Sequence, residues 1–520
     1  MPKKTIKKSH EKSIKIIAKG AGVAFIGLFL GKFFAYITRL AIARTLGPEA
    51  YGLISIALGI LTILTTVSVI GLGDGLNRFI SFHRGKKEHQ KVKSSIISSF
   101  KLTLVLSFFL CIFLFIFSDH ISKNIFSKPD LLVPLQIISI ALPFSVIKNM
   151  TSSTLRGFKM IDKDVYIRDI AKNLSTLFLV LIFSFIGASL FNISFAFLFG
   201  YIISVVFGFY FLKKHVYPKI KKTSLVPVTK ELLSFSYPLY LYGILSIIMG
   251  YTDVLMLGYF NTSDVVGIYN AALNTCILIA FVLSSFAFIF LPIISELFAK
   301  NKTKEIINLY KISTRWIFSL VLPIFLLFIL FPDNILNFLF GAEFVSGSMA
   351  LVILSIGFLT HVSVGLSMET IIAMGKPKIN FYLNSLAAIS NFLLNLILIP
   401  IYGMIGAAIA MTVALMLKNV LSLFYLNKKT GLWPYNIDYI KPILSSLVSA
   451  FLFYFIIKKI FTTSFLNLVL GFTGFLVVYI LLFLISGGLK EEDVIILKSI
   501  ENRVGIKSEF LRSIIKKFIR

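Results

Sequence analysis

Three cations lie within the first long apolar stretch of the sequence, at Lys32, Arg39 and Arg44. A cation at the centre of a membrane-spanning helix costs about 2.5–3.5 kcal/mol on insertion scales, so each must reach water or face a group that needs positive charge. Lys32 and Arg39 are seven positions apart and share one helical face. We expect both to face an internal cavity, where they favour an anionic ligand. Snorkelling to the outer headgroups explains Arg44, which precedes Gly47-Pro48.

Carboxylates and amides also occur at membrane depth. Asp253 and Glu369 are candidates for ion or proton coupling or for gate residues. For Asp253 a salt bridge to Arg39 is an equal alternative, and Glu369 is near the expected cytoplasmic end of its helix. Three asparagines along one predicted helix suit either hydrogen bonds between helices or a wall that faces a polar ligand. They are Asn384, Asn391 and Asn395.

The elements that must position these residues are membrane-spanning helices. The chain has 520 residues, of which 57% are hydrophobic and 14% charged, and its mean hydropathy is +0.90. Soluble domains are about 45–50% apolar and about 25% charged. Apolar runs of about 18 residues or more recur along the whole length, and each can cross a bilayer as a helix. The sequence predicts an all-α polytopic membrane protein with about fourteen transmembrane helices.

The placement of charge predicts the topology. The net charge is +29, and most lysines and arginines fall in alternate loops, which is typical of loops kept in the cytoplasm. We therefore expect a multi-pass protein of the plasma membrane with both termini cytoplasmic, attracted to anionic lipids rather than to nucleic acid. The main exceptions are Arg44, Lys123, Lys128 and the pair Lys458-Lys459. Both cysteines lie in predicted spans, so no disulfide framework or zinc cluster is expected.

An internal repeat divides the sequence. Thr38-Arg39 aligns with Thr252-Asp253, and Asn173 aligns with Asn391, at an offset of about 214–218 positions. In the same order, "EAYGLIS" aligns with "DVVGIYN", and "LRGFK" with "AMGKPK". Six spans return the chain to the starting side, so the halves are parallel repeats related by an axis near the membrane normal.

The repeat predicts a division into lobes. The expected parts are a cytoplasmic basic tail (1–16), an N-terminal six-helix lobe (17–212), a cytoplasmic linker (213–231), a C-terminal six-helix lobe (232–426), two additional transmembrane helices (427–489) and a cytoplasmic amphipathic tail (490–520). No GxxxxGK[ST], HExxH or CxxC motif occurs, and no loop forms an acid-rich external domain. We expect no catalytic residue, no resident metal and no cofactor, although coupling to Na⁺ or H⁺ stays open.

Several segments resemble the polysaccharide flippase branch of the multidrug/oligosaccharidyl-lipid/polysaccharide exporter superfamily. They are "RLAIARTLGPEAYGLISIALGI", "GLGDGLNRFIS", "STLRGFKMI", "YTDVLMLGYFNTSDVVGIYNAA" and "IPIYGMIGAAIA". The resemblance runs over about 17–426, and more loosely to the end of the chain. It implies two six-helix lobes that alternate between inward-open and outward-open states, and a cargo of polyprenyl- or dolichyl-phosphate-linked oligosaccharide moved to the outer leaflet.

The resemblance also implies roles for the candidate residues. Lys32 and Arg39 would hold the cargo phosphate, and the three asparagines would face its sugar. Expected partners are the lipid-linked oligosaccharide, membrane lipids and, as candidates, glycan-assembly enzymes. A cation-coupled multidrug exporter of the same superfamily is the alternative, but its cationic cargo would need an acidic pocket, whereas this first helix is basic. A membrane glycosyltransferase or polymerase is a weaker alternative, because it would need a large acidic external loop.

Overall fold

The computed structural model describes residues 3–220, 223–460 and 465–488. All regular structure in these ranges is helical, and eleven segments are long and apolar enough to cross a membrane. The predicted all-α polytopic fold is confirmed. The count of about fourteen spans is consistent with the structure but is not confirmed. Some of the eleven segments are long enough to contain two spans. The segment Ile26–Val69 has 44 residues, and at about 1.5 Å per residue its length is about twice the ~30 Å thickness of the hydrocarbon core.

Helix α1 (Lys3–Val69) is kinked where the sequence predicts a turn between two spans. Gly47 has a φ of 75° and a ψ of −178°, and Pro48 follows it. A positive φ suits glycine because it has no Cβ, and proline lacks the N–H that would continue the helix ladder. The kink therefore divides α1 into two stretches, each of which is long enough to cross a bilayer.

The chain forms two compact units. The N-terminal unit comprises Val23–Asn270 and Asn391–Ala407, and the C-terminal unit comprises Met1–Gly22, Ala271–Ser390 and Ala408–Arg520. Helices α1, α10 (Ser263–Ala299), α15 (Pro377–Tyr402) and α16 (Met404–Thr430) each contribute residues to both units. The predicted lobe boundary at 213–231 stays a prediction.

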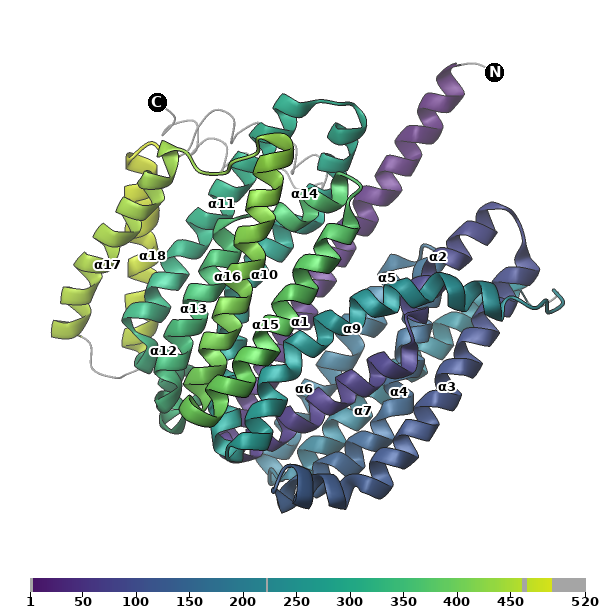
Figure 1. Cartoon of the computed structure of the whole chain (residues 1–520), viewed down its shortest axis with the longest axis horizontal. Coiled ribbons are helices and arrows are strands. Elements are labelled where there is room, and N and C mark those ends of the chain that lie inside the picture. The colour runs from purple at the N-terminus through teal and green to yellow at the C-terminus, as the bar shows by residue number, and fades with distance from the viewer. Residues whose placement is uncertain (1–2, 221–222, 461–464, 489–520) are drawn as a thin grey trace. The chain divides into compact units, whose positions relative to one another are not determined.

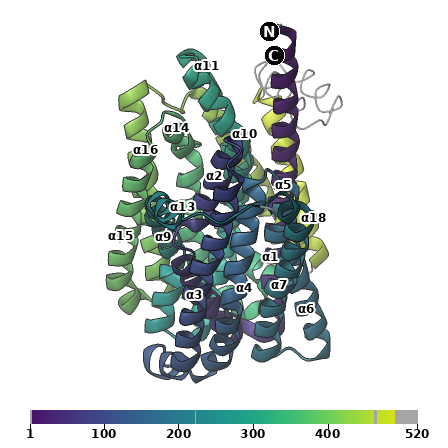
Figure 2. The ribbon, with the colours of Figure 1, turned by 90° about the vertical axis from the view of Figure 1, so that its right-hand side faces the viewer.

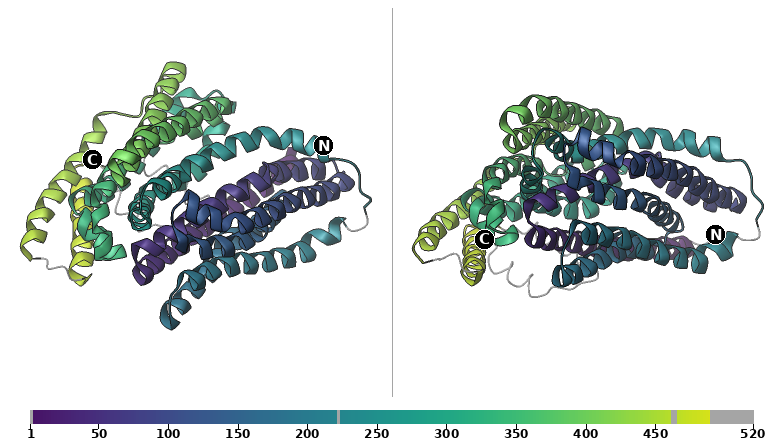
Figure 3. Two further views of the ribbon diagram at one scale, coloured as in Figure 1. Left: turned by 60° about the horizontal axis from the view of Figure 1, so that its bottom comes forward. Right: turned by 90° about the horizontal axis from the view of Figure 1, so that it is seen from below.

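The N-terminal unit is a bundle of helices joined by short turns. Figures 1 and 2 show α3, α4, α6 and α7 side by side, and Figure 3 shows the same purple-to-blue bundle from two further sides. After α1, the elements are α2 (Leu72–Gly85), α3 (His89–His120), η1 (Ile121–Ile125), η2 (Pro129–Leu131), α4 (Leu132–Gly157), α5 (Ile161–Val165), η3 (Tyr166–Ala171), α6 (Lys172–Ile186), α7 (Leu190–Phe211), η4 (Leu212–Val216), α8 (Tyr217–Ile220) and α9 (Thr229–Phe260).

Small residues bring these helices close together. The buried face of α3 is largely serine and threonine, and Ser95, Thr103 and Ser107 each satisfy their hydroxyl on a carbonyl of their own helix. A methyl group added at Gly208 of α7 would lie 2.7 Å from Thr151 Cγ2 of α4. In a membrane, lipid is as apolar as leucine, so close packing of small residues holds helices together in place of the hydrophobic effect.

The kinked region of α1 crosses the start of α10 through two glycines. A Cβ on Gly52 would lie 1.8 Å from Ser263 O, and a Cβ on Gly267 would lie 2.0 Å from Pro48 O. Beside them, Asn270 Nδ2 donates to Ser55 Oγ at 2.5 Å. The crossing lies within the N-terminal unit, and only glycine allows the two backbones to approach this closely.

The C-terminal unit contains the remaining helices, one of which is interrupted. Gly365 has a φ of +70° between α13 and α14, and Tyr310 Oη donates to the Val364 carbonyl at 2.6 Å. Irregular backbone at membrane depth needs such a partner, because no water is available there. The further elements are α11 (Thr303–Leu330), α12 (Pro332–Phe340), η5 (Ala342–Gly347), α13 (Ser348–Ser363), α14 (Ser367–Ala373), α16 (Met404–Thr430), η6 (Ile437–Tyr439), α17 (Ile440–Ile460) and α18 (Phe465–Ile485).

The last two helices pack within the C-terminal unit. Tyr479 of α18 donates its hydroxyl to Ser319 O of α11 at 2.6 Å, and the rings of Phe453 and Phe475 meet edge to face between α17 and α18. The predicted amphipathic tail, 490–520, lies outside the described residues.

Candidate functional site

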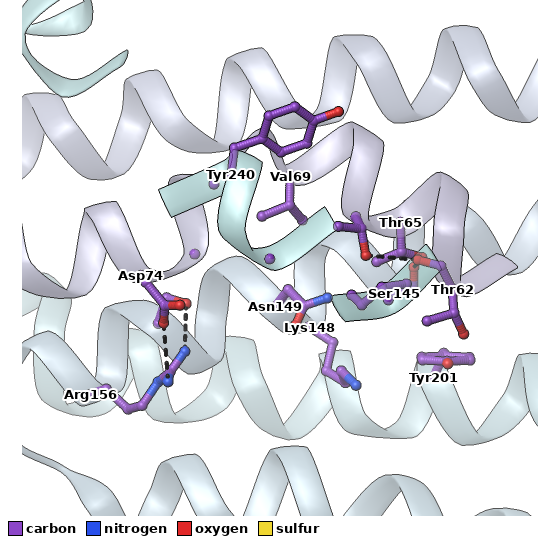
Figure 4. Close-up of a pocket in the computed structure, with 16 residues that line it drawn as sticks. Thr62, Thr65, Val69, Asp74, Ser145, Lys148, Asn149, Arg156, Tyr201 and Tyr240 are labelled. Carbon is purple, nitrogen blue, oxygen red and sulfur yellow. Dashed lines mark hydrogen bonds and ion pairs between the residues drawn. The ribbon is translucent and has the colours of Figure 1, made fainter. Parts of the chain in front are cut away.

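A pocket of about 400 Å³ opens in the N-terminal unit. Helices α1, α2, α4, α7 and α9 line it, and Figure 4 shows its polar side chains. Thr65 Oγ1 and Ser145 Oγ share a hydrogen bond of 2.6 Å across it. The polar and charged lining residues are Thr62, Thr65, Thr66, Asp74, Ser145, Lys148, Asn149, Ser153, Arg156, Tyr201 and Tyr240. Hydroxyl and amide groups in this number suit a ligand rich in hydroxyl groups.

At one end of the pocket, Arg156 joins a network of ion pairs. Its guanidinium lies 3.6 Å from Asp74 and 3.8 Å from Asp164, as atom-to-atom distances, and Figure 4 shows the contact with Asp74. Asp164 is almost fully buried, accepts a hydrogen bond from Ser152, and also faces Arg168 at 3.5 Å. The three carboxylates of this region, Asp74, Asp164 and Asp169, are thus engaged largely by two arginines.

Two lysines at membrane depth lie over aromatic rings. Lys148 Nζ of α4 is 5.2 Å from the centroid of the Tyr201 ring. Lys172 Nζ, at the start of α6, is 5.3 Å from the same ring and 5.2 Å from that of Phe197. Lys172 is also close enough to Lys148 and Arg39 for their charges to interact. Cations and ring faces attract each other, but an aromatic face does not neutralise a charge.

Lys32 lies beside Asp169, and close helix packing explains this position. A Cβ on Gly31 would lie 2.7 Å from Asp169 Cβ, and Asn173 Nδ2 donates to Gly31 O at 3.0 Å, so α1 packs directly on η3 and α6. Lys32 then interacts electrostatically with Asp169. Its side chain is exposed in the described chain, whereas Gly31 beside it is buried. Arg39 is half-buried, and Arg44 is exposed.

Cations outnumber acids among the described residues of this part of the N-terminal unit. The electrostatic and ion-pair contacts shown by these residues join six cations and three carboxylates. The cations are Lys32, Arg39, Lys148, Arg156, Arg168 and Lys172. A low-dielectric wall strengthens the field of such a cluster, so the site attracts anions.

Asp253 has a different environment. It is 2% exposed on α9 and accepts hydrogen bonds from Tyr269 Oη at 2.5 Å, Asn391 Nδ2 at 2.9 Å and Asn395 Nδ2 at 2.6 Å. All four residues belong to the N-terminal unit. Its hydrogen-bonding partners among the described residues are neutral and do not include Arg39. Asn391 and Asn395 are fully buried, so their amides make the interhelical contacts that the sequence left as one alternative.

The predicted residues Glu369 and Asn384 lie in the C-terminal unit, as does His361. Glu369 of α14 is half-buried and interacts with Lys418 of α16. His361 Nδ1 is 2.9 Å from Asn419 Oδ1, which links α13 to α16. Asn384 is half-buried and donates to Asn380 O of its own helix.

Lys128, an exception to the charge pattern, caps a helix. It is 9% exposed, and its ammonium donates to Phe126 O at 3.0 Å, Gly258 O at 2.5 Å and Asn261 O at 2.7 Å. The last carbonyls of α9 have no partner within the helix, and a cation is favourable at a helix C-terminus. Burial lowers the pKa of Lys128, and the charge of Asp264 opposes this shift. The residue therefore serves the fold and carries no topological signal.

Sequence reasoning missed Lys148 and Lys172. The charge pattern assigns both to a cytoplasmic loop, whereas α4 continues to Gly157 and the next span begins at Ile161. The signal that could have found them is the run Thr151–Thr154 between Lys148 and Gly157, because four small polar residues suit a buried helix contact. All four are buried.

Two family models match the sequence. One, described as "Polysaccharide biosynthesis protein", matches residues 17–298, and another, described as "Lipid II flippase MurJ", matches residues 169–482. The chain belongs to the polysaccharide biosynthesis protein family. Each match covers more than half of the sequence, and the resemblance inferred from the motifs is confirmed.

Two curated relatives are similar to the chain over most of its length. An uncharacterized membrane protein of Methanocaldococcus jannaschii is 28% identical, over 79% of this chain and 84% of the relative. A putative O-antigen transporter of Shigella flexneri is 25% identical, over 73% of this chain and 90% of the relative.

Solved structures share the fold. The lipid II flippase MurJ in an inward closed conformation has a TM-score of 0.70 and 17% identity, covering 88% of this chain and 97% of that chain. An inward-facing multidrug resistance MATE family transporter of the MOP superfamily has a TM-score of 0.67 and 15% identity, covering 78% and 98%. At these identities the likeness shows the fold, which is that of multi-pass membrane transporters.

Proposed function

We propose that the protein is a flippase that moves a polyprenyl- or dolichyl-phosphate-linked oligosaccharide from the inner to the outer leaflet of the plasma membrane. It works by alternating access, with both termini in the cytoplasm and no chemical step of its own. The family membership supports this proposal, as do relatives named as an O-antigen transporter and a lipid II flippase.

The observation that carries the proposal is the excess of cations in the N-terminal unit. Lys32 and Arg39 hold the cargo phosphate, since lysine and arginine bind phosphate by charge and by hydrogen bonds. The hydroxyl-lined pocket beside Lys148 accepts sugar hydroxyls. The lipid tail stays among the lipids, so the protein needs no apolar cavity to enclose it.

Asp253 is the candidate coupling group. Its carboxylate lies against two asparagines whose side-chain oxygens could complete the shell of a Na⁺ ion, or it could take a proton. A coupling role predicts that Asp253→Asn abolishes any Na⁺ or H⁺ dependence of flipping. If flipping by the wild type depends on neither Na⁺ nor H⁺, Asp253 is not a coupling group. Glu369 then remains the candidate gate residue.

Flipping can be measured directly in vesicles. The protein is reconstituted with a fluorescent polyprenyl-phosphate-linked oligosaccharide, and the cargo that reaches the opposite leaflet is bleached by an added impermeant reductant. We expect Lys32→Gln combined with Arg39→Gln to lower the initial rate at least tenfold, because a charge-assisted hydrogen bond contributes about 1.5–3 kcal/mol.

A matched control is Lys123→Gln combined with Lys302→Gln. Both lysines are exposed and paired with acids, Asp119 and Glu305, and their loss removes the same charge. The control should flip as fast as the wild type. If the Lys32 and Arg39 variant is folded and also flips at the wild-type rate, neither residue holds the phosphate.

A cation-coupled multidrug exporter is the second candidate, because a MATE transporter shares the fold. Its cargo is cationic and would be repelled by the cations of the N-terminal unit. Export of ethidium from the same vesicles, inhibited by Asp253→Asn but not by the double variant Lys32→Gln/Arg39→Gln, would favour it over the flippase.

A further inference from the structure

Lys148 and Lys172 form a pair of cations that makes no ion pair with any described residue. Both ammonium groups lie over the ring of Tyr201, and Lys172 also lies over Phe197. Within the described residues, neither ammonium has a hydrogen-bond acceptor or a carboxylate at ion-pair distance. The acids nearest to them are already engaged, because Asp164 and Asp169 pair with Arg168.

Both lysines lie within long apolar helices but are not sealed from solvent. Lys148 lies about 14 Å along the helix from Gly157, and Lys172 lies about 16 Å from Ile161. Both side chains are half-buried, and Lys148 lines the open pocket. Their charges are therefore accessible to an anionic group of a ligand in that pocket, and such a group would offset the repulsion between two cations held close together.

The pair is also distinct from the residues that hold the phosphate. Lys148 lines the hydroxyl-rich pocket, and Lys172 connects it electrostatically to Arg39 on α1. The ring of Tyr201, which lines the pocket, lies under both ammonium groups, so a ligand that fills the pocket comes next to both lysines.

We infer that Lys148 and Lys172 form a second anion subsite, which rests on the proposed flippase function and specifies its cargo. The cargo carries a second negative group beyond the phosphate at Lys32 and Arg39. That group is a second phosphoryl in a diphosphate linkage or the carboxylate of an acidic sugar next to the linkage. Tyr201 holds the two ammonium groups in place, and the bound anion supplies the counter-charge that the protein lacks.

Three cargoes distinguish the two sources of the anion. They share one fluorescent polyprenyl chain and carry a neutral glycan through a monophosphate, the same glycan through a diphosphate, or a uronic-acid-containing glycan through a monophosphate. Flipping and binding to the detergent-solubilised full chain are measured for the wild type, for Lys148→Gln/Lys172→Gln, and for the control Lys123→Gln/Lys302→Gln.

We expect the Lys148→Gln/Lys172→Gln variant to lose at least tenfold in binding and flipping for one of the two dianionic cargoes. Its loss for the neutral monophosphate cargo should be several-fold smaller than its loss for that dianionic cargo. A loss confined to the diphosphate assigns the subsite to the linkage, and a loss confined to the uronate assigns it to the sugar. The variant Lys148→Arg/Lys172→Arg keeps both charges and should restore the discrimination.

Two results would overturn the subsite. One is wild-type behaviour of the double variant with all three cargoes, and the other is an equal loss for all three, which indicates a structural role. A failure of the proposed function gives a different experimental result. If the wild type flips no cargo, the flippase proposal fails, and the binding measurements alone decide whether the lysines discriminate between the cargoes.

Discussion

Arg39 and Asp253 occupy corresponding positions in the two repeats and have opposite surroundings. Arg39 of α1 lies in a group of cations that outnumber the acids near them. Asp253 of α9 is buried and receives three hydrogen bonds from neutral donors. The two repeats share one feature at matching asparagines. Asn173 donates a hydrogen bond to α1, and Asn391 donates one to α9. Each asparagine ties a helix of its repeat to the first helix of that repeat.

The difference separates the roles of charge in the two repeats. A buried acid whose acceptors are filled by protein donors contributes to structure, and it is inaccessible to a large ligand. A group in which cations outnumber acids among the described residues attracts an anionic ligand. The prediction that opposite charges at matching positions could pair across the repeat is not what is observed for Asp253, because neutral side chains already satisfy it.

The largest expected effect comes from removing the buried acceptor. Asp253→Leu removes the acceptor of three buried hydrogen bonds, which come from Tyr269, Asn391 and Asn395, at about 1–3 kcal/mol each. We expect the free energy of unfolding in detergent to fall by about 3–6 kcal/mol, whereas Asp253→Asn, which keeps an acceptor oxygen, should lose about 1–2 kcal/mol. Equal stability of the leucine variant and the wild type would show that the acid is not structural.

Reversing the charge at the matching position should affect transport instead. Arg39→Asp places a carboxylate beside the expected phosphate position, and we expect flipping to fall between tenfold and a hundredfold with little change in the melting temperature. Lys123→Asp, at an exposed lysine, serves as the control and should flip normally. A comparable loss of stability in Arg39→Asp and Asp253→Leu would remove the contrast between the two positions.

Gly52 and Gly267 occupy matching positions in the two repeats, and both positions hold glycine. Gly52→Ala would place a methyl group 1.8 Å from Ser263 O, so the helices must separate, at a cost of about 1–3 kcal/mol in the free energy of unfolding. Gly85→Ala meets no atom within 4 Å and should be neutral or slightly stabilising. Thermal unfolding of both variants checks this, and an unchanged midpoint for Gly52→Ala would mean that the crossing is loose.

The smallest expected effect comes from replacing Lys128, whose ammonium caps the C-terminal end of α9, the helix that carries Asp253. Lys128→Leu removes the donor from the last carbonyls of α9 and should cost about 2 kcal/mol of unfolding free energy. Lys123→Leu breaks only an exposed ion pair in the same region and should change stability by about 0.5 kcal/mol or less. Similar midpoints for the two variants in a thermal melt would show that Lys128 is not a helix cap.

The spacing of apolar residues and the placement of charged residues were sufficient to predict the spanning helices, the break at Gly47-Pro48 and the repeat. They also singled out α1 as a cationic helix. They could not predict Lys148 and Lys172, since a lysine at a span's edge has the same sequence pattern whether it reaches water or turns inward. Nor could they predict that Lys32 is exposed or that Asn391 and Asn395 bind Asp253. Those outcomes depend on which faces of neighbouring helices meet, and the approach of Gly31 to Asp169 decides one of them.

The crossing of Gly52 and Gly267 joins residues that correspond in the two repeats. The two glycines are 215 positions apart, and so are Ser55 and Asn270, which contact each other beside them. In a symmetric dimer, a residue on the two-fold axis touches its own copy, so both sides of such a contact have the same side chain. In a single chain the two sides can differ, and the mixed amide–hydroxyl pair of Asn270 and Ser55 is one that no homodimer could place on its axis.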